Sequence, residues 1–385
     1  MKALNSYLYR MGKFSGQLAT LFSLLIIVLT FPLHAETCAC RSVEVEDVQK
    51  IMQLTGADSP NRTDVFDVWG TDLGIIAESP TGKIYIVFGD TFGVGRPKRG
   101  PGGSNWRSNV MAFTFDRNPA DGITLDGWIT DGHGRAKELI AGKKDPNEAR
   151  GEVTKIPTAL TILNDRIYMA FMSVQHWGDP GQWDVNYSTW AYSDDGGYTW
   201  RVVEPPFWGP KSGFVQLAVS TQRGRGNEDG YVLILGTPAG RFGGGRLARV
   251  APDKITDSSG YEYFAGVAED GTPRWSSDEK DALVIIPPPM GEASLLWNEW
   301  LSCWICTYLN EHKYALEVRA APYPWGPWSS PSIIVSGFEY PGLYGAFMTP
   351  AWTENNGEYV YFLMSQWWQY NVFLMRMTLR CNLLN

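Results

Sequence analysis

Charged residues are scarce in this chain: only 19% of its 385 residues are Asp, Glu, Lys or Arg, whereas 44% are hydrophobic. That balance excludes an intrinsically disordered chain and a coiled coil, because both need a higher share of charge. Basic residues are also in the minority, since 33 Lys and Arg stand against 41 Asp and Glu. We therefore expect no nucleic-acid partner and no binding to anionic membranes, because both select basic patches.

Histidine and cysteine are few, which argues against a metal centre. The four histidines form no H-x-x-x-H pair, and the C-x-x-C at Cys303 and Cys306 has no second copy. On a strand those two cysteines would point to opposite faces. We therefore expect no metal and no organic cofactor. An odd count of five leaves at least one cysteine unpaired, and Cys38, Cys40 and Cys381 allow a bridge between the chain ends.

The N-terminus carries the pattern of a secretory signal peptide. Lys2, Arg10 and Lys13 precede an apolar run at residues 18–31, and Ala35 offers the small residue expected at a cleavage site. The run is short for a membrane span, and an uncleaved anchor is the alternative. We therefore expect a secreted or periplasmic protein with no membrane contact after signal cleavage.

The rest of the chain reads as short strands. We divide the sequence into a signal peptide (1–35), an N-terminal lead-in segment (36–61) and one catalytic domain (62–385). Short apolar or alternating runs separated by turn signals recur, and almost nothing has the period of a long amphipathic helix. Five groups repeat one plan of strand, turn and returning strand at roughly 70 residues each. These groups occupy residues 73–90, 158–193, 214–251, 294–321 and 357–379.

Such spacing is typical of a sandwich, a barrel or a propeller, and the fivefold plan favours an all-β, five-bladed β-propeller. The segment Ser193 to Trp200, SDDGGYTW, adds support because it fits the Asp-box pattern S-x-D-x-G-x-T-W. In that motif Asp and Gly make a tight hairpin turn and Trp packs beneath it. Its role is structural, so it indicates the fold and not the chemistry.

Two aspartates are the strongest catalytic candidates. Asp72 in WGTDLG and Asp90 in GDTFG flank the first hairpin. With its turn at Pro80-Thr81, facing residue numbers sum to about 161, and these two sum to 162, so they lie nearly opposite at one end. Facing carboxylates repel each other, and unequal surroundings separate their pKa values into one proton donor and one ionised base. Glycoside cleavage needs that pair, although turn capping is the alternative.

Several stretches resemble a family of secreted five-bladed propellers, over roughly residues 62–380. They are DVWGTDLG, YIVFGDTFG, WRSNVMAF, EVTKIPT, SDDGGYTW, TPAGRFGG, PWGPWSSP, YPGLYGAFMTP and YFLMSQWWQYNVFLMR. The family was long catalogued as a domain of unknown function, and its characterised bacterial members are endo-D-arabinanases that cleave mycobacterial arabinogalactan and lipoarabinomannan. The resemblance implies that Asp72 and Asp90 are the catalytic carboxylates.

Eight further residues are candidate substrate contacts: Trp106, Arg107, Asn109, Glu152, Gln216, Arg241, Glu292 and Tyr344. The first three follow a Gly/Pro-rich loop expected above the propeller funnel, where Trp and Arg suit a furanose ring and its hydroxyls. The two glutamates precede the second and fourth strand groups. The other three lie at strand ends or Gly-rich turns. For each of the eight, the alternative is a structural role.

We therefore expect an enzyme: a secreted, monomeric, endo-acting glycoside hydrolase that cuts α-D-arabinofuranosyl linkages of cell-wall arabinan, a polysaccharide partner. One alternative is a non-catalytic carbohydrate-binding propeller. Another is a propeller hydrolase of different specificity, such as a sialidase or an L-arabinan or fructan enzyme. A sialidase needs an arginine triad and usually several Asp boxes, whereas this chain has one clear box. Both assignments of the two aspartates, and both retention and inversion, stay open.

Overall fold

The computed structural model describes residues 40–145, 147 and 151–383, so the expected signal peptide lies outside it. Regular structure in these ranges is made of strands and short 3-10 helices. The 3-10 helices are η1 (Thr63–Phe66), η2 (Pro119–Asp121), η3 (Pro252–Lys254), η4 (Ser258–Gly260), η5 (Glu279–Asp281) and η6 (Asn355–Gly357). No helix of the described residues has the length and apolar character to cross a bilayer.

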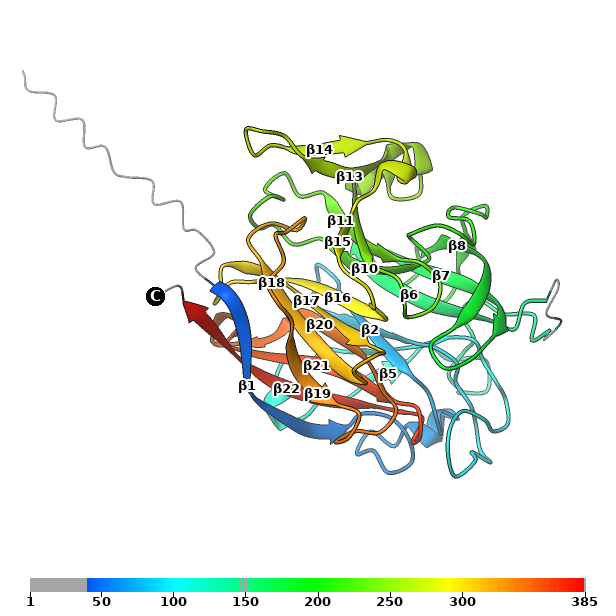
Figure 1. Ribbon diagram of the computed structural model, residues 1–385. Helices are drawn as coiled ribbons and strands as arrows, with labels where there is room; N and C mark the ends of the chain where they lie inside the picture. Colours follow the sequence, from blue (N-terminus) through cyan, green and yellow to red (C-terminus); the bar gives the residue numbers. More distant parts are fainter. Residues whose placement is uncertain (1–39, 146, 148–150, 384–385) are drawn as a thin grey trace, which may run out of the picture. The chain divides into compact units, whose positions relative to one another are not determined.

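The strands form five antiparallel sheets, each one blade of a five-bladed β-propeller, which confirms the predicted fold (Figure 1). Blade one contains β2 (Leu73–Glu78), β3 (Ile84–Phe88), β4 (Val110–Thr114) and β5 (Gly127–Trp128). Blade two contains β6 (Thr154–Leu163), β7 (Arg166–Trp177), β8 (Trp183–Ser193) and β9 (Arg201–Val202). Blade three contains β10 (Gln216–Ser220), β11 (Val232–Thr237), β12 (Gly245–Val250), β13 (Tyr261–Val267), β14 (Pro273–Ser276) and β15 (Val284–Ile286).

Blades four and five complete the ring. Blade four contains β16 (Ala293–Asn298), β17 (Cys303–Asn310), β18 (Ala315–Ala321) and β19 (Ser332–Ser336). Blade five contains β20 (Leu343–Glu354), β21 (Tyr359–Gln366), β22 (Asn371–Leu383) and β1 (Cys40–Gln53). The innermost strands β2, β6, β10, β16 and β20 contact one another in blade order, and β2 touches both β6 and β20.

The ring is closed by strand β1, which comes from the segment treated as a lead-in. It pairs antiparallel with β22, from Val43 opposite Cys381 to Gln53 opposite Phe373. Val43 is buried and Glu44 is exposed, as an amphipathic edge strand requires. Pairing the two ends of the chain in one blade covers the outer edge of β22 and leaves β1 as the edge strand of that sheet.

Aromatic side chains fill much of the core between blades. Trp190 of β8 and Trp208 are almost completely buried between blades two and three, with Tyr261 of β13 beside them. Trp190 Nε1 donates to the hydroxyl of Tyr261 at 2.9 Å, so the polar atoms of both rings are satisfied inside the core. Part of the high aromatic content therefore serves packing.

The Asp box forms the turn between β8 and β9, as predicted. Asp195 Oδ1 accepts the backbone N–H of Thr199 at 2.9 Å, and Asp195 Oδ2 accepts its hydroxyl at 2.7 Å. Gly197 has φ +100°, and an added Cβ would meet the side chain of Met111. Trp200 Nε1 donates to the Gly197 carbonyl oxygen at 2.8 Å. The motif is a structural turn.

The cysteines of the C-x-x-C on β17 have different states. Cys303 is disulfide-bonded, as is Cys381, whereas Cys306 is a buried free thiol. The two are therefore not joined to each other, and burial raises the pKa of Cys306 far above its usual value. A dithiol redox role for this pair has no support in the structure.

Candidate active site

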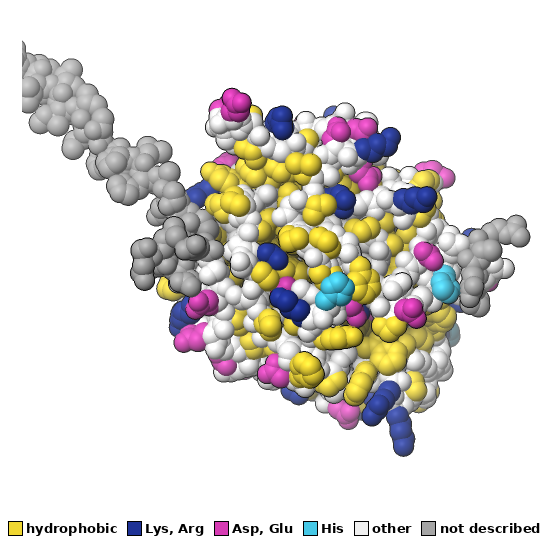
Figure 2. Space-filling model, viewed as in Figure 1, with side chains coloured by type: hydrophobic (Ala, Val, Ile, Leu, Met, Phe, Trp, Pro, Cys, Tyr) yellow, Lys and Arg dark blue, Asp and Glu magenta, His cyan; other side chains and the backbone are white. Residues whose placement is uncertain are grey.

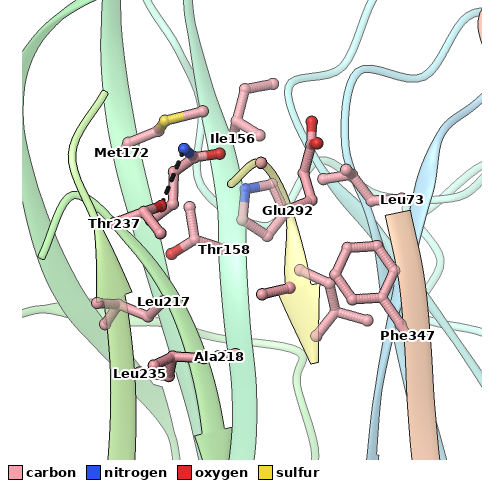
Figure 3. Close-up of a pocket in the computed structure, with 15 residues that line it drawn as sticks. Leu73, Ile156, Thr158, Met172, Leu217, Ala218, Leu235, Thr237, Glu292 and Phe347 are labelled. Atoms are coloured by element: carbon pink, nitrogen blue, oxygen red, sulfur yellow. Dashed lines mark hydrogen bonds between the residues drawn. The ribbon is translucent and has the colours of Figure 1, made fainter. Parts of the chain in front are cut away.

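The five inner strands begin at the same end of the central channel, which we call the funnel mouth. Each inner strand contributes to the lining, with Leu73, Ile156, Gln216, Ala293 and Phe347 as one example from each blade. In Figure 3 Glu292 reaches one end of the channel, whereas Leu217, Ala218 and Leu235 lie at the other. The channel has about 30 Å³ of space for water, enough for about two molecules. A molecule larger than these waters would therefore have to bind above the mouth.

Asp72 and Asp90 stand together at this mouth. The register of the first hairpin places Leu73 opposite Phe88, and Gly89 N–H donates to the Asp72 carbonyl oxygen at 3.2 Å. The negative charge of Asp90 contributes to raising the pKa of Asp72, so the two groups interact electrostatically. A Cβ at Gly89 would lie 2.4 Å from Asp72 Oδ1. Only glycine before Asp90 therefore leaves room for the Asp72 carboxyl.

The surroundings of Asp72 favour its protonated form. Burial, and then the charge of Asp90, raise its pKa to about 7, although hydrogen bonding from Tyr344 and Tyr370 opposes the rise. Tyr344 Oη donates to Asp72 Oδ2 at 2.8 Å. The other oxygen, Oδ1, is buried and has no well-formed hydrogen bond to the described residues. A buried oxygen without a well-formed hydrogen bond disfavours the anion, so Asp72 is suited to hold a proton.

The surroundings of Asp90 favour its ionised form more strongly than the surroundings of Asp72 favour the ionised form of that residue. Its Oδ1 accepts the indole N–H of Trp106 at 2.7 Å and the hydroxyl of Thr154 at 2.6 Å. Burial raises its pKa to about 6, and these two hydrogen bonds and the charge of Lys144 limit the rise. Two donors on one oxygen stabilise the carboxylate. The two aspartates thus differ in the direction that acid–base catalysis needs.

The raised pKa of Asp72 predicts a pH-dependent stability effect. Stability gained from a carboxyl whose folded pKa is raised is fully present below the unfolded pKa, about 4, and is lost as pH rises through about 7. Asp72→Asn removes this loss. We expect its melting temperature to exceed that of the wild type at pH 8, and the difference to vanish near pH 4.

Asp195→Asn is the matched control, because hydrogen bonds from Thr199 lower the pKa of Asp195 to about 2. Stability from that group is present above the unfolded pKa and is lost as pH falls toward 2. The control should therefore lower the melting temperature at pH 8. Thermal unfolding of both variants is measured across this pH range. The same pH dependence of melting temperature in both would contradict a raised pKa for Asp72 and a lowered pKa for Asp195.

Arg241 of blade three contacts residues of blades four and five, and through them it is connected to Asp72 and Asp90, which we call the acid pair. It lies in the loop between β11 and β12, and its Nη2 donates to Glu292 Oε1 at 2.8 Å. Its Nη1 donates to Glu311 Oε2 at 3.2 Å, and its guanidinium lies 5.1 Å from the ring centre of Tyr344. Gln216 Nε2 donates to the Gly240 carbonyl oxygen at 2.7 Å and so holds the same loop. Gln216, Arg241, Glu292 and Tyr344 therefore all lie at the funnel mouth.

The predicted residues after the Gly/Pro-rich loop have other contacts. Trp106 stacks on Phe92 with ring centres 5.9 Å apart and points its N–H at Asp90, so it orients that carboxylate. Arg107 is 4% exposed, and its guanidinium donates to the backbone carbonyls of Asn105, Ala136 and Asp67. These contacts hold the Arg107 guanidinium inside the protein, and its contact with substrate stays a prediction.

Asn109 and Glu152 are also held inside the protein. Asn109 is fully buried and exchanges hydrogen bonds with the backbone of Ile140, at 2.8 and 3.0 Å. Glu152 is 4% exposed and accepts the Ser173 hydroxyl at 2.7 Å, and Lys155 Nζ lies 3.6 Å from it. Asn109 thus connects blade one to the segment that leads into blade two, whereas these contacts of Glu152 lie within blade two.

Three further residues of the site escaped the sequence analysis. Thr154 and Tyr370 contact the acid pair directly, and Lys144 lies 4.5 Å from the Trp106 ring centre. The signals were the position of Thr154 just before the second strand group and that of Tyr370 at a strand–turn junction of the last group. Contacts between residues of different blades leave no periodic pattern in the sequence, so they could not be predicted from it.

The comparisons with known proteins agree with the fold. A sequence profile described as a domain of unknown function (DUF4185) matches residues 58–376, whereas no curated protein matches the chain. A Bacteroides ovatus ATCC 8483 protein, described as a candidate hydrolase, is 13% identical with a TM-score of 0.58, over 87% of this chain and 93% of the other. Exo-beta-1,3-galactanase from Phanerochaete chrysosporium is 8% identical with a TM-score of 0.50, over 86% and 64%. These similarities concern the fold.

Proposed function

The chain belongs to the DUF4185 family, and we propose that it is a secreted glycoside hydrolase that cuts α-D-arabinofuranosyl linkages within cell-wall arabinan. The observation that carries the proposal is the pair Asp72 and Asp90, whose pKa values are raised to about 7 and about 6 by unequal surroundings. Two carboxyl groups in different protonation states are what glycoside cleavage needs. The resemblance of the sequence motifs to endo-D-arabinanases supports the choice of substrate.

In the proposed mechanism Asp72 is the acid and Asp90 the base or nucleophile. Asp72 gives its proton to the leaving glycosidic oxygen as the bond from that oxygen to C1 breaks. Asp90 either takes a proton from the water that attacks C1 or itself bonds to C1 until water releases the sugar. The distance between the two carboxyl groups with substrate bound decides between these routes. About 5–5.5 Å predicts retention of the anomeric configuration, and about 6.5–9.5 Å predicts inversion.

Export is part of the proposal. Disulfides form and persist in oxidising compartments, and Cys303 and Cys381 are both disulfide-bonded. The signal-peptide pattern at residues 1–35 supports the same destination. A polymeric cell-wall substrate also requires an enzyme outside the cytoplasm.

The test is incubation of residues 36–385 with mycobacterial arabinogalactan, with chromatography of the released oligosaccharides at a series of pH values. We expect oligomers of several lengths and a bell-shaped kcat/KM profile with its maximum between about pH 6 and 7. The rate falls below this window as Asp90 is protonated and above it as Asp72 loses its proton.

The rival functions give different results in the same experiment. Binding of arabinan with no release identifies a carbohydrate-binding propeller. Hydrolysis of sialosides, L-arabinan or fructan, with arabinogalactan left intact, identifies a hydrolase of different specificity. Either result would contradict the proposed substrate.

A further inference from the structure

Exposed aromatic rings lie on the rim of the funnel mouth, and none of them takes part in the mechanism above. In each blade the inner strand runs away from the mouth and the second strand returns to it, so the turn before the third strand lies at the mouth. Trp177, Phe242 and Trp367 lie in or next to such turns and are 42%, 39% and 47% exposed. Hydrophobic side chains also lie beside charged ones on the face seen in Figure 2.

One group of rings belongs to blade five and is connected to Asp72 through Tyr370. Trp367 and Trp368 form the turn between β21 and β22, and Tyr370 ends it. Gly100 N–H donates to the Trp368 carbonyl oxygen at 3.1 Å, and Arg99 lies 4.7 Å from the Trp368 ring centre. These contacts hold the turn against the Gly/Pro-rich loop of blade one. We call Trp367 and Trp368 the first aromatic arm.

The second group belongs to blade two and is connected to Asp72 through Arg241 of blade three and Tyr344 of blade five. Trp177 and Trp183 face each other across β7 and β8, with ring centres 5.6 Å apart at 68°. Arg241 lies 5.8 Å from the Trp183 ring centre and 5.1 Å from that of Tyr344, which donates to Asp72. We call Trp177 and Trp183 the second aromatic arm.

The order of the blades places the two arms on different sides of the acid pair. The pair belongs to blade one, which lies between blade five and blade two because β2 touches both β20 and β6. Sugar rings have an apolar C–H face and polar edges, so they stack on indoles that stand next to charged groups. A protein partner would favour one contiguous apolar patch, whereas these rings form two separate groups.

We propose that the two aromatic arms bind sugar residues of one neutral polysaccharide chain, on either side of the bond that the acid pair cleaves. The inference rests on the proposed function and adds the binding sites of the chain that extends beyond the cleaved linkage. A polysaccharide that is bound on both sides of the cleaved linkage extends in both directions from it. Cleavage therefore occurs within the polysaccharide and not at its end.

The experiment measures the affinity of arabinan for the Asp72→Asn protein by affinity electrophoresis, so that the substrate is not consumed. In that background we compare Trp367→Ala and Trp177→Ala with Trp300→Ala. Trp300 is 48% exposed and lies between β16 and β17, at the end of blade four away from the mouth. Each arm variant should weaken binding about tenfold, and Trp300→Ala should not change it.

Kinetics in the otherwise wild-type protein give the second readout. Trp367→Ala and Trp177→Ala should raise KM for long arabinan about tenfold and leave kcat nearly unchanged, because stacking contributes equally before and during bond cleavage. Unchanged affinity and KM in both arm variants would overturn the inference and leave the proposed function intact. If arabinan does not bind at all, the same variants are tested against other neutral polysaccharides. If the arm variants lose such binding, the result supports sugar binding by the aromatic arms and refutes arabinan as the substrate. If no polysaccharide binds, both the inference about the arms and the arabinan substrate are refuted.

Discussion

Asp72→Asn is expected to lower kcat on arabinan about a thousandfold, because the leaving oxygen then departs without a proton. The loss should depend on the leaving group. On an arabinan oligosaccharide with a 4-nitrophenol leaving group, which departs readily as an anion, the same variant should lose less than tenfold. Parallel assays of the two substrates give the comparison directly. The variant keeps the shape of the side chain and an oxygen that accepts the Tyr344 hydroxyl.

Asp131→Asn is the control for this prediction. Asp131 pairs with Arg135 on the surface of blade one, and its loss should leave both rates unchanged. Equal losses of Asp72→Asn on the natural and the activated substrate would show that Asp72 does not act as the acid. Cooperative thermal unfolding of the variant at pH 8, at a melting temperature no lower than that of the wild type, separates a catalytic loss from misfolding.

Asp90→Ala is expected to abolish turnover of both substrates, with kcat lowered by a factor of about 10³–10⁴. A better leaving group does not help, since the step that fails is the attack on C1. Azide should restore turnover of the activated substrate and yield a glycosyl azide of inverted configuration, because azide enters from the face that Asp90 occupied. Nuclear magnetic resonance of the azide product gives the configuration. A product of retained configuration would instead make Asp90 the acid.

Trp106→Phe tests how the charge on Asp90 is maintained. The variant removes one of the two donors to Asp90 Oδ1 and keeps an aromatic ring against Phe92. Losing a donor to the anion raises the pKa of Asp90, so the acidic limb of the kcat/KM profile should move upward. If the variant is active and the acidic limb of its kcat/KM profile does not move, then the pKa of Asp90 does not determine that limb.

The blades were predictable where sequence neighbours pair with each other. The hairpin of β2 and β3 brings Asp72 and Asp90 to one end, and its register follows from the turn between them. Strand β1 was missed because its partner β22 comes from the other end of the chain. The extra strands β13, β14 and β15 of blade three were missed as well, because they fall in an irregular stretch between two strand groups.

The position of Asp72 and Asp90 at one end of the hairpin was predictable, but most of their contacts with other blades were not. Thr154, Tyr344 and Tyr370 reach the two aspartates from blades two and five, so their contacts depend on closure of the ring. The same holds for Arg241, whose ion pairs to Glu292 and Glu311 join blades three and four. Sequence spacing gives positions within one blade, whereas the pKa difference arises between blades.

The most direct test of the account compares wild type, Asp72→Asn, Asp90→Asn and the double variant on mycobacterial arabinogalactan, with new reducing ends measured over time. We predict oligosaccharide release by the wild type and near-background rates in all three variants. The double variant should be no slower than the slower single variant, because the two residues act as a unit. Undiminished release by both single variants would contradict the assignment of the acid pair.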